Sequence, residues 1–412
     1  MRVAIYHNLP PGGAKRALWE FVRRTADIHE YDLYTIDMGR ADDFAYARDS
    51  AEQHDLGPFV VRTFRYPLLP GLAGRVPLGK VQSLDAVRRI LGVERTVARD
   101  INAGGYDVVY VHPCQLTHTP SVLRLLDLPS LHYMQEPRRQ SFEAGYRPAP
   151  RLAGPGSVPR WAATTVLERA LRRRDRLAAA AADRIACNSY YSAECIRRAY
   201  GRTATVCYLG VDTDVFTDVF TDGSPAVPPP ARPVAISVGA LDRVKGHDLV
   251  VRALALLPEG ERPSLRLVYE RCDPAYRLEV EALAQSLGVR LEFRQGISDA
   301  ALVGLYRSAS VTVLAAQLEP FGLVPLESLA CGTPVVALRE AGYRETVEHG
   351  VNGYLVDRSA TEMADALGRV LSGRLGASAA ALRADVVSRW NWDTAVKRQL
   401  ELLGATAGTG RP

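Results

Sequence analysis

Residues 318–336 read LEPFGLVPLESLACGTPVV, and within them two carboxylates, Glu319 and Glu327, are separated by seven residues. The preceding residues 310–316 (SVTVLAA) are apolar and β-branched, a composition typical of a buried strand. Glu319 would follow this strand in a loop at the carboxyl edge of a sheet. Ligands of open α/β sheets bind at that edge, so we expect Glu319 to lie in a binding site.

A short helix is predicted directly after the loop. Pro325 is tolerated near the first turn of a helix, because the N–H that it lacks needs no partner there. The sequence Cys-Gly-Thr-Pro then ends the apolar run, so the helix should cover residues 326–330 and carry Glu327 in its first turn. Three backbone N–H groups would point out of the helix start and favour an anion, namely those of Gly322, Leu323 and Val324.

Two carboxylates beside an anion-binding helix start indicate a ligand that carries both phosphate and hydroxyl groups. Carboxylates repel a bare phosphate, but they accept hydrogen bonds from sugar or ribose hydroxyls. A sugar nucleotide has both kinds of group. The alternative is a pair of surface glutamates at a helix entrance, and the Glu-x7-Glu spacing alone does not exclude it.

The frame EPFGLVPLE, followed by ACGTPVVA, resembles the signature of the retaining, family-four nucleotide-sugar glycosyltransferases. The resemblance implies an α/β chain with the GT-B fold, in which two Rossmann-like, doubly wound parallel-sheet domains face a central cleft. It also implies that Glu319 holds hydroxyls of the donor sugar and that Glu327 holds the ribose diol. Phe321 would belong to the same donor site.

The bulk composition is that of an ordinary soluble globular protein. The chain has 412 residues, 47% of them hydrophobic, and a formal net charge of +5, which does not argue for nucleic acid as a partner. Its six cysteines show no C-x2-C spacing, so we expect reduced core residues in a cytoplasmic protein. No apolar run reaches the length of a membrane span, and the N-terminal run is too short for a signal peptide.

The first half of the chain opens like a nucleotide-type βαβ unit. An apolar strand over residues 2–7 is followed by Gly12 and Gly13 and by a helix over residues 14–26. A lone glycine pair is also compatible with a plain tight turn. The family resemblance implies that the pair is the N-terminal Gly-Gly loop, which faces the donor phosphates and the acceptor.

A second polar position follows a later strand of this half. Residues 130–134 form a predicted strand that ends at Gln135. In the family that the chain resembles, a histidine often stands here near the acceptor, so Gln135 is a departure. A glutamine can orient an acceptor hydroxyl, but it cannot act as a general base near neutral pH.

Two segments of the first half allow more than one interpretation. Residues 67–77 are apolar and flanked by basic residues, which fits an ordered surface loop or a peripheral membrane contact at the inner face of a membrane. The helix predicted over residues 161–182 is rich in arginine, which fits a solvated helix face, a lipid contact or a phosphorylated acceptor.

A proline-rich stretch, SPAVPPPARP, separates the two halves, and strand–helix alternation restarts after it. We therefore predict an acceptor-binding domain, a linker, a nucleotide-sugar-binding domain and a closing helix that crosses back onto the first domain. Their bounds are residues 1–212, 213–232, 233–388 and 389–404.

Lys245 lies after the first strand of the second half, in the sequence Gly-Ala-Leu-Asp-Arg-Val-Lys-Gly. Relatives carry an arginine and this lysine as a clamp on the donor diphosphate, but the arginine position is Ala240 here. Arg243 could replace the missing charge or point to solvent. The resemblance further implies that Gly296 reads the nucleobase and that Glu345 holds the Glu319 loop.

The resemblance implies retention through a front-face, oxocarbenium-like pathway in which Glu319, Lys245 and Gln135 form the catalytic set. The donor would be a nucleoside-diphosphate sugar, UDP-sugar before GDP-sugar, and the acceptor a hydroxyl group of a glycan, a lipid-linked molecule or a natural product. No Asp-x-Asp motif ends a strand, so neither a metal nor a prosthetic group is expected.

Two other functions are compatible with the same residues. The loss of arginine at Ala240 and of histidine at Gln135 fits a catalytically weak partner subunit that binds a sugar nucleotide. A GT-B epimerase, which acts on a sugar nucleotide without an acceptor, is the other alternative.

Overall fold

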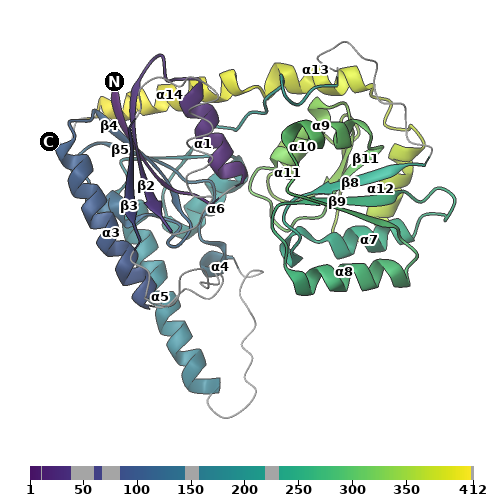
Figure 1. Cartoon of the computed structure of the whole chain (residues 1–412), viewed down its shortest axis with the longest axis horizontal. Helices are drawn as coiled ribbons and strands as arrows, with labels where there is room; N and C mark the ends of the chain where they lie inside the picture. Colours follow the sequence, from purple (N-terminus) through teal and green to yellow (C-terminus); the bar gives the residue numbers. More distant parts are fainter. Residues whose placement is uncertain (11, 39–59, 67–83, 144–156, 219–231, 410–412) are drawn as a thin grey trace. The chain divides into compact units, whose positions relative to one another are not determined.

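The computed structural model describes residues 1–10, 12–38, 60–66, 84–143, 157–218 and 232–409. The chain divides into two compact units (Figure 1). Unit 1 comprises Met1–Tyr208 together with Val396–Pro412, and unit 2 comprises Leu209–Ala395. The last helix, α14 (Trp392–Ala407), begins in unit 2 and belongs to unit 1 from Val396 onward.

The described strands of unit 1 form one parallel sheet in the order β3-β2-β1-β4-β5-β6-β7. Its elements, in chain order, are β1 (Arg2–Asn8), α1 (Gly13–Arg23), β2 (Glu30–Asp37), β3 (Val60–Arg65), α3 (Leu84–Ala103), β4 (Val108–Cys114), the 3-10 turn η1 (Ser121–Arg124), β5 (Ser130–Tyr133), α4 (Arg139–Phe142), α5 (Ser157–Ala181), β6 (Arg184–Cys187), α6 (Tyr190–Tyr200) and β7 (Thr205–Val206).

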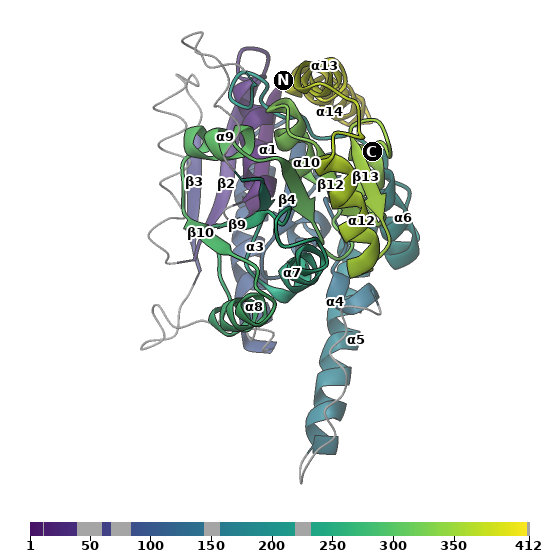
Figure 2. The same cartoon turned by 90° about the vertical axis from the view of Figure 1, so that its right-hand side faces the viewer.

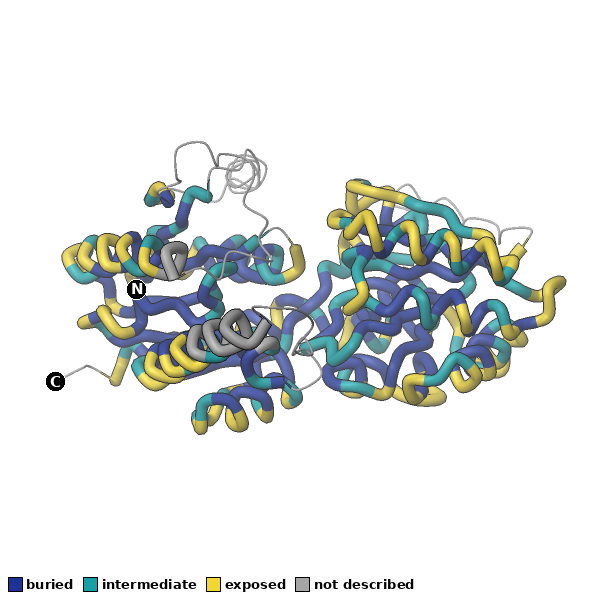
Figure 3. Tube along the Cα trace, turned by 90° about the horizontal axis from the view of Figure 1, so that it is seen from below, coloured by how far each residue is buried: buried dark blue, intermediate teal, exposed yellow. Residues whose placement is uncertain are grey.

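Both faces of the unit 1 sheet are covered, which is why β1 is buried almost throughout and reads as a continuous apolar run. On one face, Phe21 of α1 packs edge-on against Tyr110 of β4 at 5.0 Å between ring centroids. Tyr110 also donates a hydrogen bond of 2.8 Å to Gln399 of α14. Residues of α3, η1 and α5 join the core on the opposite face. Figure 3 shows the result as buried strands between helices whose outer sides are exposed.

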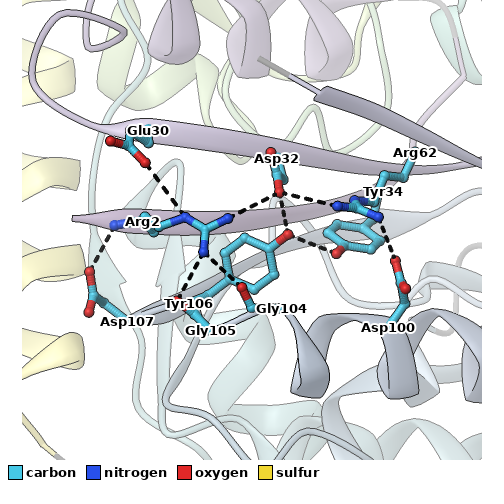
Figure 4. A network of polar contacts seen from close by, with 10 residues as sticks. All are labelled: Arg2, Glu30, Asp32, Tyr34, Arg62, Asp100, Gly104, Gly105, Tyr106 and Asp107. Carbon is cyan, nitrogen blue, oxygen red and sulfur yellow. Dashed lines mark hydrogen bonds and ion pairs between the residues drawn. The ribbon is translucent and has the colours of Figure 1, made fainter. Parts of the chain in front are cut away.

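A polar network closes the amino-terminal edge of this sheet (Figure 4). The Asp32 carboxylate of β2 accepts a hydrogen bond from Tyr106, whose hydroxyl is 2.8 Å from that of Tyr34. The guanidinium of Arg2 lies 3.7 Å from Asp32, and that of Arg62 lies 3.9 Å from it. These contacts join β1, β2 and β3 at the edge opposite to the one where ligands bind, so they are structural.

The described strands of unit 2 form a second parallel sheet in the order β10-β9-β8-β11-β12-β13. Its elements are β8 (Val234–Val238), the 3-10 turn η3 (Arg243–Lys245), α7 (His247–Ala255), β9 (Ser264–Tyr269), α8 (Pro274–Ser286), β10 (Leu291–Gln295), α9 (Asp299–Arg307), β11 (Val311–Leu314), α10 (Leu323–Ala330), β12 (Val335–Leu338), α11 (Tyr343–Thr346), β13 (Gly353–Val356), α12 (Ala360–Leu371) and α13 (Ala379–Arg389).

Helices α7, α8 and α12 share a core with one face of the unit 2 sheet, while α9 and α10 lie on the other face (Figures 1 and 2). The strand order reverses between β8 and β11 in unit 2 and between β1 and β4 in unit 1. Such a switch point separates the loops at the carboxyl ends of the two central strands and leaves a crevice for a ligand. The predicted fold class, two Rossmann-like parallel-sheet domains, is confirmed.

The structure differs from the sequence prediction in several places. Helix α10 begins at Leu323, three residues before the predicted start, so Glu327 lies in its second turn. The edge strand β3 was not predicted, because its residues are mostly exposed and show no apolar alternation. Residues 67–77 and most of the proline-rich linker, 219–231, lie outside the described residues. All six cysteines are free.

The described part of the linker lies against unit 2. The guanidinium of Arg383 on α13 donates to the carbonyls of Thr213 and Phe216 and lies 3.2 Å from Asp218. Arg307 of α9 donates to the carbonyl of Thr217 over 2.6 Å. No helix among the described residues is long and apolar enough to cross a membrane.

Candidate donor-binding site

The turn that carries Lys245 follows β8 at the switch point of unit 2. Asp242 caps this turn, because its side chain accepts hydrogen bonds from the backbone N–H groups of Val244 and Lys245. Gly246 ends the turn with φ of 66°, and a Cβ there would lie 2.5 Å from the carbonyl oxygen of Ala315. Only glycine fits this position, which explains the Lys-Gly pair in the sequence.

The loop that carries Glu319 follows β11 on the other side of the switch point. Its backbone is strained, since Leu318 adopts φ of 50° without being a glycine. Two contacts hold it: the carbonyl of Glu319 accepts from Gly342 N–H over 2.8 Å, and Leu318 N–H donates to the Glu340 carboxylate over 3.3 Å. Arg358 in turn bonds both oxygens of Glu340. Glu340 therefore helps to hold this loop, and the role expected for Glu345 stays a prediction.

Lys245 and Glu319 meet across the switch point. Nζ of Lys245 lies 2.8 Å from Oε2 of Glu319, and the two side chains are 29% and 22% exposed. The two turns are also joined through the backbone, because Gln317 N–H donates to the carbonyl of Val244 over 2.8 Å. Both side chains remain partly open to water, so a ligand can replace the ion pair. The lysine can then bind a diphosphate, and the carboxylate can accept a hydrogen bond from a sugar hydroxyl.

Helix α10 starts beside this pair. Its N-cap is Gly322, with φ of 93°, and Leu323 and Val324 are its first two helical residues. The ring of Phe321 is buried and packs against Trp390 at 5.8 Å between centroids. Phe321 therefore supports the turn with its ring, while the backbone of Gly322 begins the helix.

Glu327 is 6% exposed, which is unusual for a carboxylate. Its Oε2 accepts a hydrogen bond of 3.1 Å from the hydroxyl of Tyr306 on α9. Sequence reasoning missed Tyr306, since a tyrosine in an amphipathic helix is an ordinary core residue. A buried carboxylate requires hydrogen-bond donors around it. That requirement is the one signal that could have indicated a hydrogen-bonding side chain near Glu327.

The remaining predicted donor-site residues lie in two further places. Arg243 is 66% exposed, forms an ion pair with Glu279 of α8, and lies over the ring of Tyr276 at 5.4 Å. Gly296 follows β10 with φ of 61°, and its N–H donates to the carbonyl of Tyr269 over 3.1 Å. The structure thus brings Lys245 and Glu319 together, whereas Arg243 is held by another element.

Gly12 and Gly13 lie at the carboxyl end of β1 in unit 1. Gly12 is the N-cap of α1 with φ of 136°, a conformation that side chains rarely adopt, and its carbonyl accepts from Lys15 N–H and Arg16 N–H. His7 at the end of β1 is buried, and burial followed by the charge of Lys15 lowers its pKa to about 3. His7 is therefore neutral at physiological pH.

Gln135 follows β5 on the same edge of unit 1. Its carbonyl accepts a hydrogen bond of 2.7 Å from Ser192 Oγ, which fixes the backbone. Its side-chain Nε2 is buried and has no hydrogen-bond partner among the described residues. Both ring nitrogens of the buried His112 are likewise unpartnered there, and burial lowers the pKa of His112 well below its usual value. Such atoms require water or a ligand.

No group of three or more His, Cys, Asp or Glu side chains that could hold a metal ion occurs among the described residues. Of the charged side chains predicted to bind the donor, Lys245, Glu319 and Glu327 lie close to the switch point of unit 2, and Glu319 already pairs with Lys245. This set suits hydroxyl and phosphate groups of an organic ligand.

Comparison with known proteins adds three findings. The family model for glycosyl transferases group 1 matches residues 224–385. A D-inositol 3-phosphate glycosyltransferase of Xylanimonas cellulosilytica is 30% identical over 420 residues, which cover 94% of this chain and 94% of that protein. A D-inositol 3-phosphate glycosyltransferase of Acidothermus cellulolyticus is 39% identical over 176 residues, which cover 40% of this chain and 39% of that protein.

Solved structures share the fold. A sucrose-phosphate synthase from Thermosynechococcus elongatus has a TM-score of 0.75 at 21% identity and covers 99% of this chain and 100% of its own. The Anabaena protein HepE, solved with UDP and glucose, has a TM-score of 0.69 at 20% identity, with 98% and 100% covered. With a relative that matches nearly the whole chain, the protein belongs to the group 1 glycosyltransferases, the family-four type with the GT-B fold that residues 318–336 indicate.

Proposed function

We propose that this protein is a retaining, metal-independent glycosyltransferase that moves a hexose-type sugar from a nucleoside-diphosphate sugar to a hydroxyl acceptor. The observation that carries the proposal is the pair formed by Lys245 and Glu319 across the switch point of unit 2, 2.8 Å apart. Each side chain is the complement of one part of a sugar nucleotide. Lys245 balances diphosphate charge, and Glu319 accepts hydrogen bonds from sugar hydroxyls.

Donor binding would exchange the ion pair for ligand contacts. Because both side chains are partly exposed, their mutual attraction is weakened by solvent and is no obstacle to the exchange. Glu327 would accept hydrogen bonds from the ribose hydroxyls, and the N–H groups at the start of α10 would face a phosphate. HepE was solved with UDP, so a UDP-sugar is the first donor to test and a GDP-sugar the second.

The reaction exchanges one bond at the anomeric carbon for another. The bond from that carbon to the diphosphate oxygen breaks, and a bond to the acceptor oxygen forms on the same face. The acceptor proton passes to the leaving diphosphate oxygen, so no side chain need act as a base. Lys245 and the start of α10 stabilise the negative charge that develops on the diphosphate.

The acceptor would bind at unit 1, where Gln135 and the Gly12–Gly13 turn lie at carboxyl ends of strands. The buried, unpartnered Nε2 of Gln135 can donate a hydrogen bond to an acceptor hydroxyl. Two of the curated relatives are named D-inositol 3-phosphate glycosyltransferases, so D-inositol 3-phosphate is the first acceptor to test. A lipid-linked acceptor at the inner face of a membrane is the second.

The second candidate is a catalytically weak partner subunit, and the observation that favours it is the ion pair between Arg243 and Glu279. Ala240 stands where relatives carry an arginine, and Arg243 is committed to Glu279. A subunit without a complete diphosphate clamp would bind a sugar nucleotide but turn it over slowly.

One experiment separates these functions. The purified protein is incubated with UDP-, GDP-, ADP- and TDP-sugars, with and without D-inositol 3-phosphate, and release of nucleoside diphosphate is followed. A transferase releases it only with an acceptor, and the product's anomeric configuration by NMR, with and without EDTA, tests retention and metal independence. Conversion of the donor without an acceptor would indicate an epimerase, and binding without turnover would indicate the partner subunit.

A further inference from the structure

Tyr306 fixes the carboxylate of Glu327 inside unit 2. Its hydroxyl donates to Oε2 of Glu327 over 3.1 Å, and its side chain is completely buried. A hydrogen bond to an ionised acceptor is stronger than one between neutral groups, and the surrounding core excludes competing water. The direction of the Glu327 carboxylate is therefore determined by α9 as well as by its own helix.

Tyr306 is itself immobilised at the end of α9. Its carbonyl accepts a hydrogen bond of 2.7 Å from Oγ1 of Thr333. Its ring packs edge-on against Phe216 at 6.4 Å between centroids. A tyrosine held at both its backbone and its ring has little freedom to reorient, so its hydroxyl is a fixed donor.

The residue after Glu327 is held in the same way. Ser328 Oγ donates to the carbonyl of Thr333 over 2.8 Å and lies 2.7 Å from Oγ1 of Thr312 on β11. Since the Ser328 hydroxyl hydrogen is used in the bond to Thr333, Thr312 must be the donor in the other contact. Ser328, Thr312 and Thr333 are all buried. A connected polar chain thus runs from β11 through α10 to the Cys-Gly-Thr-Pro turn and to Tyr306.

We propose that Tyr306 is a positioning residue that sets the preference for a ribonucleotide donor. With Oε2 oriented by Tyr306, the remaining carboxylate lone pairs of Glu327 have a fixed direction toward the two hydroxyls of a ribose. Without this hydrogen bond the carboxylate is less restrained, and binding the diol must restrict it further. The inference rests on the proposed role of Glu327 as the ribose acceptor.

The test compares ribonucleotides with their 2′-deoxy forms. UDP, GDP and ADP, and the 2′-deoxy form of each, are titrated calorimetrically into the full-length protein, and the base that binds most tightly is carried forward. Tyr306→Phe removes one oxygen atom. We expect it to weaken binding of the ribonucleotide by about three- to tenfold, because a less restrained carboxylate must be ordered when the diol binds, and to leave the 2′-deoxy form nearly unchanged.

Tyr34→Phe is the matched control, because Tyr34 is also fully buried and its hydroxyl also has a buried side-chain partner, the hydroxyl of Tyr106, but in unit 1. It should leave both affinities unchanged. Circular dichroism and thermal melting confirm that each variant is folded. If Tyr306→Phe weakened both nucleotide forms equally, or neither, Tyr306 would be a structural residue and the inference would be wrong.

Glu327→Gln distinguishes failure of the Tyr306 inference from failure of the proposed function. It should abolish the preference for the ribonucleotide in an otherwise wild-type chain. If Glu327→Gln abolished the preference and Tyr306→Phe did not change it, only the role of Tyr306 would fall. If Glu327→Gln kept the preference, or if the wild type bound none of the nucleotides, the ribose role of Glu327 and the inference would both fall.

Discussion

The two units have the same arrangement of central strands but very different side chains at the carboxyl ends of those strands. In unit 2, the switch point carries Lys245 and Glu319, which are charged, paired and partly exposed. In unit 1, the corresponding edge carries His7, His112 and Gln135, which are uncharged and have buried nitrogens without partners among the described residues, although the buried Lys15 adds one charge beside His7. One fold thus supports two kinds of polar edge.

The difference follows from what each edge would bind. A diphosphate carries negative charge that must be balanced, and a side chain that is to balance it must stay charged and therefore near water until the ligand arrives. A hydroxyl-rich acceptor needs hydrogen-bond donors and acceptors, which neutral imidazoles and amides provide. The predictions below test this division of charge between the units.

The largest effect is expected at Lys245. Lys245→Ala removes a preorganised cation, so transition-state stabilisation should fall by about 3–4 kcal/mol. The corresponding decrease in kcat/KM is roughly a hundred- to a thousandfold. Steady-state kinetics with the active donor measures this change. Lys397→Ala, at an exposed position on α14, is the control and should behave like the wild type. A decrease of less than tenfold for Lys245→Ala would mean that the charge at this edge does not serve catalysis.

Acidification should destabilise unit 1 before unit 2. Burial lowers the pKa of five unit 1 histidines: to about 3 for His7, to about 4 for His118 and His132, well below the usual value for His112, and below the usual value for the partly exposed His29. In unit 2, His247 behaves in the same way, with a pKa of about 4. A histidine that is neutral in the folded state takes up its proton on unfolding, so its stabilising contribution is complete above pH 6.5 and declines as the pH falls toward 4.

Two buried carboxyl groups of unit 1 act in the opposite direction. Burial raises the pKa of Asp175 to about 6 and also raises that of Glu94, so these groups favour the folded state as the pH falls. They are two against five histidines, so the net loss should remain. Hydrogen–deuterium exchange at pH 7 and pH 5, corrected for intrinsic rates, should show peptides of unit 1 opening first. Earlier opening of unit 2 would contradict the comparison.

The next largest effect is expected at Glu327, the carboxylate proposed to bind the ribose hydroxyls. Glu327→Ala removes an acceptor of hydroxyl hydrogen bonds, each worth roughly 1.5–3 kcal/mol when charge-assisted, so donor affinity should fall at least tenfold. Calorimetry with the donor nucleotide measures it, and an unchanged melting profile in the absence of ligand establishes that the variant is folded. Unchanged affinity would remove Glu327 from the site.

The strands and the main helices of both units could be predicted from the sequence, because buried parallel strands read as continuous apolar runs. Strand β1 begins at the predicted residue and extends one residue further, and Glu319 follows a buried strand, as the sequence indicated. Lys245 was identified through the family resemblance. The start of α10 was predicted too late, because Pro325 was taken as a marker of the helix start although it is the third helical residue.

Contacts between residues far apart in the sequence could not be predicted. Nothing in the sequence pairs Tyr306 with Glu327, Arg358 with Glu340, or Arg243 with Glu279. These contacts depend on which helix faces which loop after folding, and a single chain carries no local pattern for that. Strand β3 was not predicted for another reason, since an exposed edge strand need not alternate polar and apolar residues.

A smaller effect is expected at Arg243, which we propose as a partial substitute for the arginine missing at Ala240. Its ion pair with Glu279 is exposed and worth roughly 0–1 kcal/mol, so it can be released for a diphosphate at little cost. Arg243→Ala should lower kcat/KM several-fold, well below the effect of Lys245→Ala. Adding Ala240→Arg should restore activity. Wild-type kinetics for Arg243→Ala would leave the diphosphate to Lys245 and the start of α10.

The smallest effect is expected at Gln135, the neutral member of the proposed catalytic set. If the leaving diphosphate accepts the acceptor proton, no side chain at this position needs to titrate. Gln135→Ala should then lower turnover modestly, because its unpartnered Nε2 no longer orients the acceptor, while the backbone stays fixed by Ser192. Gln135→His should be tolerated.

The pH dependence of Gln135→His decides between the two proposed functions. A histidine that merely replaces an amide as a hydrogen-bond donor leaves the rate and its pH profile close to those of the wild type. An increase of several orders of magnitude, with a new titration near pH 6–7, would mean that the glutamine disables a base that the reaction needs. The charged edge of unit 2 would then bind a donor that unit 1 is not equipped to use, and the partner-subunit function would be favoured.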